Sequence, residues 1–274
     1  MVTSAGVVLA GGRSARMGTA KAGLEWHGST LLYRATAVVA RAVDGPVVVV
    51  AARGQELPEL PAGVAVVEDP VEGLGPMQGL AAGLAAVADR AGVAFVCSTD
   101  LPFLHPAYVR RVLRGLTDDT DGERTDGGHF DVALPMARGF RQPLAAAYRT
   151  RIAGLVADLV ARGDDRPGMI FRHCAVAQLD DAALLADAEL AARDPELDSV
   201  LNVNTPGDYA AARDREPPEV MVDGNPVRAA TVGAAARAVG ADRRAVVTVN
   251  GDRVTTDGRF PLVAGDRVAF RPAG

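Results

Sequence analysis

The sequence predicts an α/β protein with a mostly parallel sheet flanked by helices, followed by a small α+β domain. From about residue 7 to about residue 212, short β-branched segments alternate with longer segments rich in alanine, leucine and arginine. This alternation is typical of a parallel sheet whose crossover helices cover both faces. After a charged, proline-containing stretch at 213–219, the order changes to hairpin, helix and strands. We therefore predict two domains, residues 1–215 and residues 219–274.

The first domain is expected to alternate strands with helices. Its strands are predicted from β-branched apolar segments, at residues 7–9, 47–51, 64–67, 93–97, 131–135 and 145–148. Its helices are predicted from segments of helical length and composition, at residues 30–42, 78–90, 106–116 and 151–162. The strands before residue 100 contain almost no polar residues, so we expect them to be buried on both faces.

The second domain is predicted to open with a hairpin, because strands 220–222 and 226–228 flank the turn sequence Asp-Gly-Asn. A helix at 231–239 follows, with Thr231 suited to its N-cap and Gly240 to the position after its end. Two further strands are expected at 245–249 and 267–270.

Composition excludes several classes of protein. The chain has 274 residues, of which 49% are hydrophobic and 23% charged, and this excludes a disordered or fibrous chain. A net charge of −5 is not that of a general nucleic-acid binder. No apolar run approaches the roughly 18–20 residues that cross a bilayer, so no membrane partner is expected. Cys97 and Cys174 alone make neither a disulfide framework nor a zinc site, and with no secretory signal we expect a cytoplasmic protein.

A glycine-rich loop follows the first predicted strand. Residues 9–18 read LAGGRSARMG, and Lys21, the one lysine among 29 basic residues, comes just after. Glycines allow backbone N–H groups to approach phosphate oxygens, and Arg13, Arg16 and Lys21 supply positive charge. The spacing matches neither the Walker loop nor the dinucleotide fingerprint. The loop therefore predicts a polyphosphate site of another kind, the alternative being a plain turn with solvated arginines.

An acidic residue follows the fourth predicted strand, where residues 95–102 read FVCSTDLP. In an open α/β sheet Asp100 would lie at the same edge as the glycine-rich loop. One carboxylate beside a triphosphate is a usual way to hold Mg²⁺, so we predict a magnesium site there. The alternative is that Asp100 only caps the next turn. Asp69, after the third strand, either faces the same cleft or opens a turn.

Five motifs together resemble the molybdenum cofactor guanylyltransferases, a group of MobA-like NTP transferases. They are the two described above and, further along, GPMQGL at 75–80, RQPL at 141–144 and NVNTP at 202–206. The resemblance spans residues 5–213 and implies a Rossmann-like fold of the nucleotide-diphospho-sugar transferase type. It also implies an enzyme that converts GTP and molybdenum-bearing molybdopterin into a guanine dinucleotide cofactor and pyrophosphate.

The resemblance further implies which residues bind the substrates. The nucleotide-binding residues would be Leu9, Ala10, Gly11, Gly12, Lys21, Asp69, Gly79 and Asp100. Asp100 would also hold Mg²⁺, and Asn202 and Asn204 would lie on the pterin side. The two glycines at 11 and 12 favour GTP over CTP. The family has an asparagine at about Ala52, so this chain lacks that side-chain amide.

The implied chemistry needs no general base, because the attacking phosphate is already an anion. Catalysis would depend on holding two anions in line and neutralising the charge that develops on the α-phosphate and the departing pyrophosphate. Arg16, Lys21 and the Mg²⁺ on Asp100 are suited to that task.

Residues 219–274 resemble the β-grasp (ubiquitin-like) sulfur carriers of molybdopterin and thiamine synthesis, the MoaD/ThiS-like proteins. The motifs are VNGD at 249–252 and LVAGDRV at 262–268. Such carriers end in Gly-Gly, whereas this chain ends in Ala273-Gly274 only a few residues after its last strand. We therefore expect a docking domain for molybdenum cofactor pathway proteins, with activation of Gly274 as the alternative.

Two other functions stay open at this point. One is a related nucleotidyltransferase that uses CTP or a sugar phosphate. The other is a weakly active scaffold that recruits molybdenum cofactor or sulfur-transfer partners.

Overall fold

The computed structural model describes residues 2–11, 21–69, 75–117, 128–242, 244–254 and 257–272. Its larger sheet has eight strands, and seven of them follow the order β10–β7–β9–β6–β1–β4–β5, with β8 paired to β7. The strands are β1 (Ser4–Leu9), β4 (Val47–Ala51), β5 (Ala65–Glu68), β6 (Val93–Ser98), β7 (Val132–Ala137), β8 (Phe140–Arg141), β9 (Ala145–Arg149) and β10 (Val176–Asp180). Along the main path only β9 runs antiparallel to its neighbours, so the prediction of a mostly parallel sheet is confirmed.

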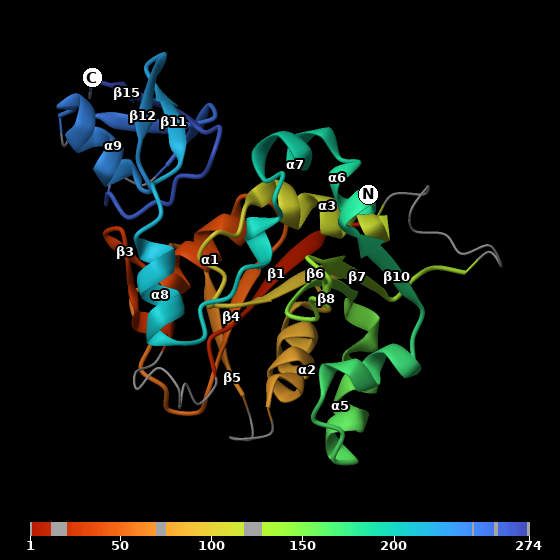
Figure 1. Ribbon diagram of the computed structural model, residues 1–274. Helices are drawn as coiled ribbons and strands as arrows, with labels where there is room; N and C mark the ends of the chain where they lie inside the picture. The colour runs from red at the N-terminus through yellow and green to blue at the C-terminus, as the bar shows by residue number, and fades with distance from the viewer. Residues whose placement is uncertain are drawn as a thin grey trace.

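Helices cover both faces of this sheet, as Figure 1 shows. The covering helices are α1 (Leu31–Ala40), α2 (Pro76–Val87), α3 (Pro106–Thr117) and α5 (Ala153–Ala161). Because neighbouring strand residues point to opposite faces, Val8 packs in one apolar cluster with α1 and α3. Val7 and Leu9 pack in a second cluster with α2 and α5. The sheet is thus the middle of three layers.

Local sequence explains how two of these helices begin. The Thr30 hydroxyl accepts a hydrogen bond from the backbone N–H of Tyr33 at 3.1 Å, which caps α1. Helix α2 begins at Pro76, two residues before the predicted start, after Gly75 with a φ of 74°. A proline is well placed in the first turn, where its missing N–H costs nothing. In the middle of α2, a Cβ on Gly83 would lie 2.3 Å from a methyl of Val7, so this glycine lets the helix approach β1.

Several short elements were not predicted, because two to eight residues are too few to show a period. In the first domain they are the strands β8 and β10 named above, β2 (Glu25–Trp26), β3 (Ser29–Thr30), α6 (Asp181–Leu185), α7 (Ala188–Arg193), α8 (Pro206–Arg213) and the 3₁₀ turns η1 (Lys21–Gly23), η2 (Thr150–Ile152), η3 (Pro167–Arg172) and η4 (Asp198–Val200). The third predicted strand, now β5, is an edge strand with Val66 50% exposed, so the expectation that it is buried was wrong. No helix in the described ranges is both long and apolar enough to cross a bilayer.

The described part of residues 219–272, here termed the C-terminal unit, forms a second sheet in the order β12–β11–β15–β13–β14. Its elements are β11 (Glu219–Val222), β12 (Asn225–Arg228), α9 (Val232–Val239), β13 (Val246–Val249), β14 (Asp252–Arg253) and β15 (Arg267–Arg271). The predicted hairpin is present, and its turn residues Asp223 and Gly224 both have positive φ, at 46° and 88°. The predicted caps of α9 are also present, with Thr231 accepting from Ala234 N–H and Gly240 at a φ of 66°.

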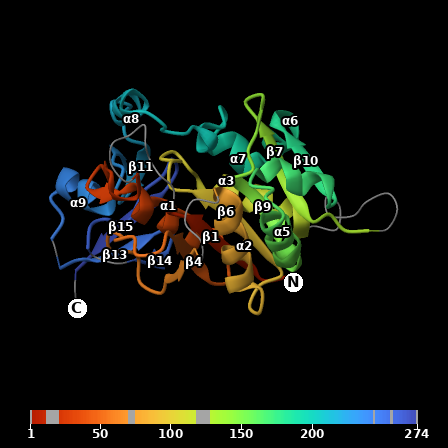
Figure 2. The ribbon, with the colours of Figure 1, turned by 90° about the horizontal axis from the view of Figure 1, so that it is seen from below.

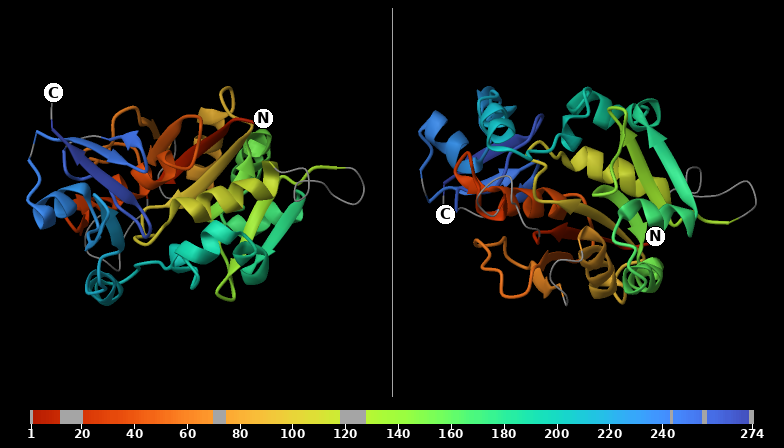
Figure 3. Two further views of the ribbon diagram at one scale, coloured as in Figure 1. Left: turned by 90° about the horizontal axis from the view of Figure 1, so that it is seen from above. Right: turned by 60° about the horizontal axis from the view of Figure 1, so that its bottom comes forward.

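The C-terminal unit lies at one end of the molecule, beside α1, and β10 and α5 lie toward the other end (Figures 2 and 3). It has its own apolar cluster, which includes Val220, Val232 and Leu262. Val263, however, is 4% exposed and belongs to the cluster that α1 and α3 form with the main sheet. The C-terminal unit therefore contributes an apolar side chain to the core of the main sheet.

Candidate active site

The strand ends bring the predicted motifs to one edge of the main sheet. Leu9 at the end of β1 pairs with Ser98 at the end of β6 and with Val50 near the end of β4. The residues that follow these strands therefore meet, and such an edge is where open α/β sheets bind their ligands. The NVNTP segment joins them, because Val203 N–H donates to the carbonyl of Asp100 at 3.0 Å.

Lys21 connects three of the predicted motifs through one ammonium group. Its Nζ donates to Oδ2 of Asp100 at 2.9 Å and to Oδ1 of Asn204 at 2.8 Å. The Ser98 hydroxyl donates to the other oxygen, Oδ1, of Asp100. The Lys21 and Asp100 side chains keep exposed fractions of 18% and 13%, so both are accessible to a ligand. Residues that lie 79 and 183 positions apart in the chain thus form one charged group.

The end of β1 is held tightly against the end of β4. The backbone N–H groups of Ala10 and Gly11 both donate to the carbonyl of Val50, at 2.8 and 3.2 Å. A Cβ on Gly11 would lie 3.2 Å from the backbone nitrogen of Ala52. This close approach explains why the position is a glycine.

Gln55 makes a contribution that the sequence did not indicate. Its Nε2 donates to the carbonyl of Ala10 at 3.1 Å, and its Oε1 accepts from the N–H of Ala52 at 2.9 Å. A carboxamide is therefore present beside Ala52, although it comes from a residue three positions later. The residue lies in a loop with no periodicity and no motif, so no sequence signal could have singled it out. Ser98 was within a quoted motif, but its bond to Asp100 was likewise not predicted.

The other predicted residues have different surroundings. Asp69 directly follows β5, and its N–H donates to the carbonyl of Ala51 at 2.7 Å. Gly79 is buried in α2, where a Cβ would lie 3.4 Å from a methyl of Leu9, so helix packing alone requires a small residue there. Asn202 is exposed and is not one of the residues bonded to Lys21. The predicted residues Gly12 and Arg16 lie outside the described ranges.

Within the described ranges, this site has neither a thiol of lowered pKa nor a cluster of metal-ligating side chains. Burial raises the pKa of the Cys97 thiol far above its ordinary value, so Cys97 behaves as a small apolar residue of β6. Among the described residues, no group of three or more histidine, cysteine or acidic side chains could hold a metal ion. A metal bound here would depend on Asp100 together with oxygen ligands of the substrate.

A family model described as the MobA-like NTP transferase domain matches residues 6–182. The chain belongs to this family. It is therefore a nucleotidyltransferase, and its relatives include the "Probable molybdenum cofactor guanylyltransferase" of Mycobacterium tuberculosis H37Rv. That protein is 42% identical over 167 residues, which cover 60% of this chain and 76% of the relative. A protein of the same name from Mycobacterium ulcerans is 38% identical over 196 residues, which cover 70% of this chain and 91% of the relative.

A solved structure shares the fold of this MobA-like chain. The molybdopterin-guanine dinucleotide biosynthesis protein A of Archaeoglobus fulgidus superposes with a TM-score of 0.56 at 21% sequence identity. The match covers 77% of this chain and 97% of the archaeal protein. The comparison shows that the two proteins share a fold over the superposed part of this chain.

Proposed function

We propose that this chain is a molybdenum cofactor guanylyltransferase, which joins GMP from GTP to molybdenum-bearing molybdopterin and releases pyrophosphate. The observation that best supports the proposal is the ammonium group of Lys21, which links Asp100 to Asn204 beside the end of β1. The three residues come from the segment after the glycine-rich stretch of sequence, the acidic strand end and the NVNTP segment. A reaction between two bound anions requires such a meeting point. Because GTP is its donor, we place the reaction in the cytoplasm.

We assign the nucleotide to the edge formed by Leu9, Ala10 and Gly11, with Gly12, Asp69 and Gly79 as further nucleotide-binding positions. Lys21 contacts the phosphates once they are bound. In the free protein two of its three N–H groups are used by Asp100 and Asn204, so the ammonium is already held in place. A phosphate oxygen that takes over these bonds meets a cation that needs little reorganisation. We assign Arg16 the role of a second positive charge for the phosphates, and this assignment is based on the sequence alone.

The residues present fit a magnesium ion. Asp100 offers carboxylate oxygens, which Mg²⁺ prefers, and Mg²⁺ is commonly held by one or two carboxylates with substrate phosphates and water. When bound, the ion would neutralise charge on the phosphates. Ser98 donates to one carboxylate oxygen and Lys21 to the other, which fixes the orientation of the carboxylate before any ligand arrives.

The chain's own residues then act mainly by alignment and charge. The terminal phosphate of molybdopterin is already an anion, so no side chain has to remove a proton from it. Lys21 stabilises the negative charge that shifts to the departing pyrophosphate. We place the pterin beside Asn202 and Asn204, where Asn204 contacts the same ammonium group and so keeps the two substrates adjacent.

We also propose that residues 1–215 and 219–274 are two domains, the second a β-grasp domain. Its support is the sheet order, in which the parallel pair β11 and β15 is central and each member has an antiparallel partner, with the one helix α9 between the hairpins. Its exposed surface is available to proteins of molybdenum cofactor synthesis.

The test is pyrophosphate release by the intact chain with molybdenum-bearing molybdopterin, Mg²⁺ and either GTP or CTP. We expect release with GTP and a dinucleotide product whose mass contains GMP. Release with CTP alone would assign the chain to cytidylyl transfer. No release with either nucleotide, with the pterin verified intact, would leave a scaffold as the better explanation.

A further inference from the structure

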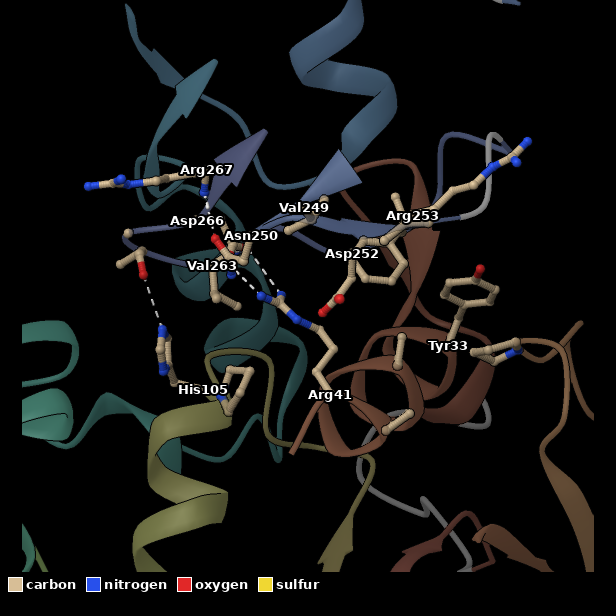
Figure 4. A pocket seen from close by; sticks show the side chains of 18 of the residues that line it. Tyr33, Arg41, His105, Val249, Asn250, Asp252, Arg253, Val263, Asp266 and Arg267 are labelled. Atoms are coloured by element: carbon tan, nitrogen blue, oxygen red, sulfur yellow. Dashed lines mark hydrogen bonds and ion pairs between the residues drawn. The ribbon is translucent and has the colours of Figure 1, made fainter. Parts of the chain in front are cut away.

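The C-terminal unit contacts both the end of α1 and the loop that carries Asp100, and these contacts are built from buried polar groups. One of them is Asp266, which is 2% exposed. Its carboxylate accepts from both terminal nitrogens of Arg41, the residue that follows α1, at 3.1 and 2.5 Å, and from Asn250 Nδ2 and Val263 N–H, each at 2.9 Å. Figure 4 shows Arg41 reaching from the end of α1 to this carboxylate, at the border of a cavity of about 1080 Å³ that is lined by α1 and by residues of the C-terminal unit. The turn that contains Val263 is thereby fixed to the end of α1.

His105 makes a second link, on the loop between β6 and α3. It is 7% exposed, and its Nδ1 accepts from the N–H of Ala107 at 3.0 Å. The proton of the neutral ring is therefore on Nε2, which donates to the carbonyl of Ala264 at 3.1 Å (Figure 4). His105 lies five residues after Asp100, so this bond ties the far end of the Asp100 loop to the C-terminal unit.

Arg34 of α1 makes the third link, and it joins the two parts directly. Its side chain is buried, with the residue 6% exposed. Nε donates to the carbonyl of Pro102, two residues after Asp100, and Nη1 donates to the carbonyl of Leu262 at 3.4 Å. Burial lowers the pKa of Arg34 to about 10, so the guanidinium stays charged at neutral pH. A buried guanidinium needs acceptors, and one of these two belongs to the C-terminal unit.

The near end of the same loop is held within the first domain. Lys21 and Ser98 bind the Asp100 side chain, and Val203 N–H binds its carbonyl. The segment 100–105 is thus fixed at one end by the candidate site and at the other end by the C-terminal unit, together with the Ser199 hydroxyl, which accepts from His105 N–H at 3.1 Å. A displacement of the turn that contains Val263 would therefore be transmitted along this segment to the Asp100 carboxylate.

We propose that the C-terminal unit is a built-in brace of the Asp100 loop, which positions this carboxylate for the transfer reaction through Arg34 and His105. The proposal rests on the proposed function for its effect on catalysis. It gives the C-terminal unit a role inside its own chain, separate from any partner that binds its outer surface. Arg34 and His105 are positioning residues, since neither contacts the proposed substrates.

The experiment uses the full chain with the substitutions Arg34→Met and His105→Asn. Met fills much of the arginine's volume but cannot donate to Pro102 or Leu262. Asn at 105 can still accept from Ala107 N–H, but it is too short to reach Ala264, so it removes one bond and is the milder change. The control is Arg271→Met, which breaks an exposed ion pair with Asp223 inside the C-terminal unit.

Two measurements are made on each variant and on the wild type. The first is the rate of GTP-dependent pyrophosphate release as a function of Mg²⁺ concentration. We expect kcat to fall about 10-fold to 100-fold for Arg34→Met, as small misplacements in a site can cause, and less for His105→Asn. We also expect the Mg²⁺ concentration for half-maximal rate to rise and excess Mg²⁺ to restore part of the rate, because the brace acts on the metal-binding carboxylate.

The second measurement is hydrogen exchange of the amides of Leu104, His105 and Val203 by mass spectrometry of the covering peptides. These amides are bonded within or to the loop, so loss of the brace is expected to speed their exchange in both variants and not in Arg271→Met. Exchange needs no nucleotide. An inactive wild type with faster exchange in the variants would therefore contradict the proposed function and leave the brace standing.

The brace is overturned by either of two results. In the first, folded variants show wild-type exchange in the loop. In the second, the rate falls only as far as the folded fraction falls, with an unchanged Mg²⁺ requirement. The second result would mean that the contacts only stabilise the fold.

Discussion

Two aspartates show how differently this molecule uses a carboxylate. Asp266, with 3% of its side chain exposed, accepts from four donor groups of Arg41, Asn250 and Val263. Asp100, with 13% exposed, accepts only from the side chains of Lys21 and Ser98 among the described side chains. A carboxylate whose lone pairs are all used holds structure, whereas one with accessible oxygens can bind a ligand. Asp266 should therefore matter for folding and Asp100 for chemistry.

The largest expected effect is on turnover by Asp100→Asn. The amide is a poorer ligand for a metal ion and carries no charge for Lys21, so we expect pyrophosphate release to fall by about 10²–10³-fold, the scale for loss of one electrostatic contact in a reaction site. Thermal stability should change little, because the ion pair is partly exposed. The exposed Asp89→Asn is the matched control, and equal loss of rate in both variants would contradict the distinction.

The second effect is on stability, measured by denaturant unfolding of Asp266→Asn. Neutralising this carboxylate leaves the charge of Arg41 largely buried and uncompensated, with its side chain 15% exposed. We expect a loss of about 3 kcal/mol in the free energy of unfolding, as for other broken buried ion pairs. Asp223→Asn, which breaks the exposed pair with Arg271, should cost less than about 1 kcal/mol. A similar loss of unfolding free energy in both variants would mean that Asp266 stabilises the fold no more than an exposed aspartate does.

The same contrast explains what the sequence could predict. Signals that act over a few residues were correct, such as Thr231 at the N-cap of α9 and the hairpin turn at Asp223 and Gly224. The edge holding Asp100 was predictable as well, because parallel strands end together and the motifs follow those strands.

Contacts between distant segments were not predictable. Gln55, Arg34 and His105 act on carbonyl groups that lie 45, 68 and 159 positions away, and a carbonyl has no residue identity to recognise. The strand at 245–249 was predicted, but its partner strand β14 has only two residues and shows no period, so the pairing of β13 with β14 was missed. The burial of a strand likewise depends on which strands lie beside it. The apolar sequence at 64–67 does not show this, so β5 was wrongly expected to be buried although it lies at the edge of the sheet.

Gln55→Glu tests whether an uncharged residue of the candidate site affects nucleotide binding. We expect its effect to be smaller than the effects of the changes at the two aspartates. The new carboxylate can still accept from Ala52 N–H, but in its charged form it cannot donate to the carbonyl of Ala10 and faces it with an oxygen. We expect the KM for GTP to rise about 10-fold, since one bond beside the nucleotide loop becomes a repulsion. Gln178→Glu, exposed on β10, is the control.

A carboxyl group at position 55 regains a donor when it is protonated, so the defect of Gln55→Glu should lessen as the pH falls from about 6 toward about 4, where a glutamate ordinarily titrates. Steady-state kinetics at several pH values, compared with the wild type at each, measure this recovery. A defect that is the same at every pH would show that the bond to Ala10 does not govern nucleotide binding.

The smallest expected effect is the pH dependence of stability that comes from His105. Burial is the main cause that lowers the pKa of its imidazole below the ordinary value of 6.5, and the charge of Arg41 acts in the same direction, while the bond to Ala264 and the charges of Asp194 and Asp266 oppose it. Protonation would also place a hydrogen on Nδ1, where Ala107 N–H now donates.

The unfolded chain therefore binds the proton more readily than the folded chain does. Stability from the neutral ring is fully present above pH 6.5 and is lost as the pH falls below 6.5 toward the lower folded-state pKa. We expect the Tm of the wild type to drop more between about pH 7.5 and about pH 5.5 than the Tm of His105→Asn, which has no group that titrates at this position. His27, whose pKa is also lowered by burial and by Arg213, contributes equally to both proteins and cancels in the difference. Parallel Tm curves would mean that position 105 does not sense pH, and that the link to Ala264 survives protonation of the ring.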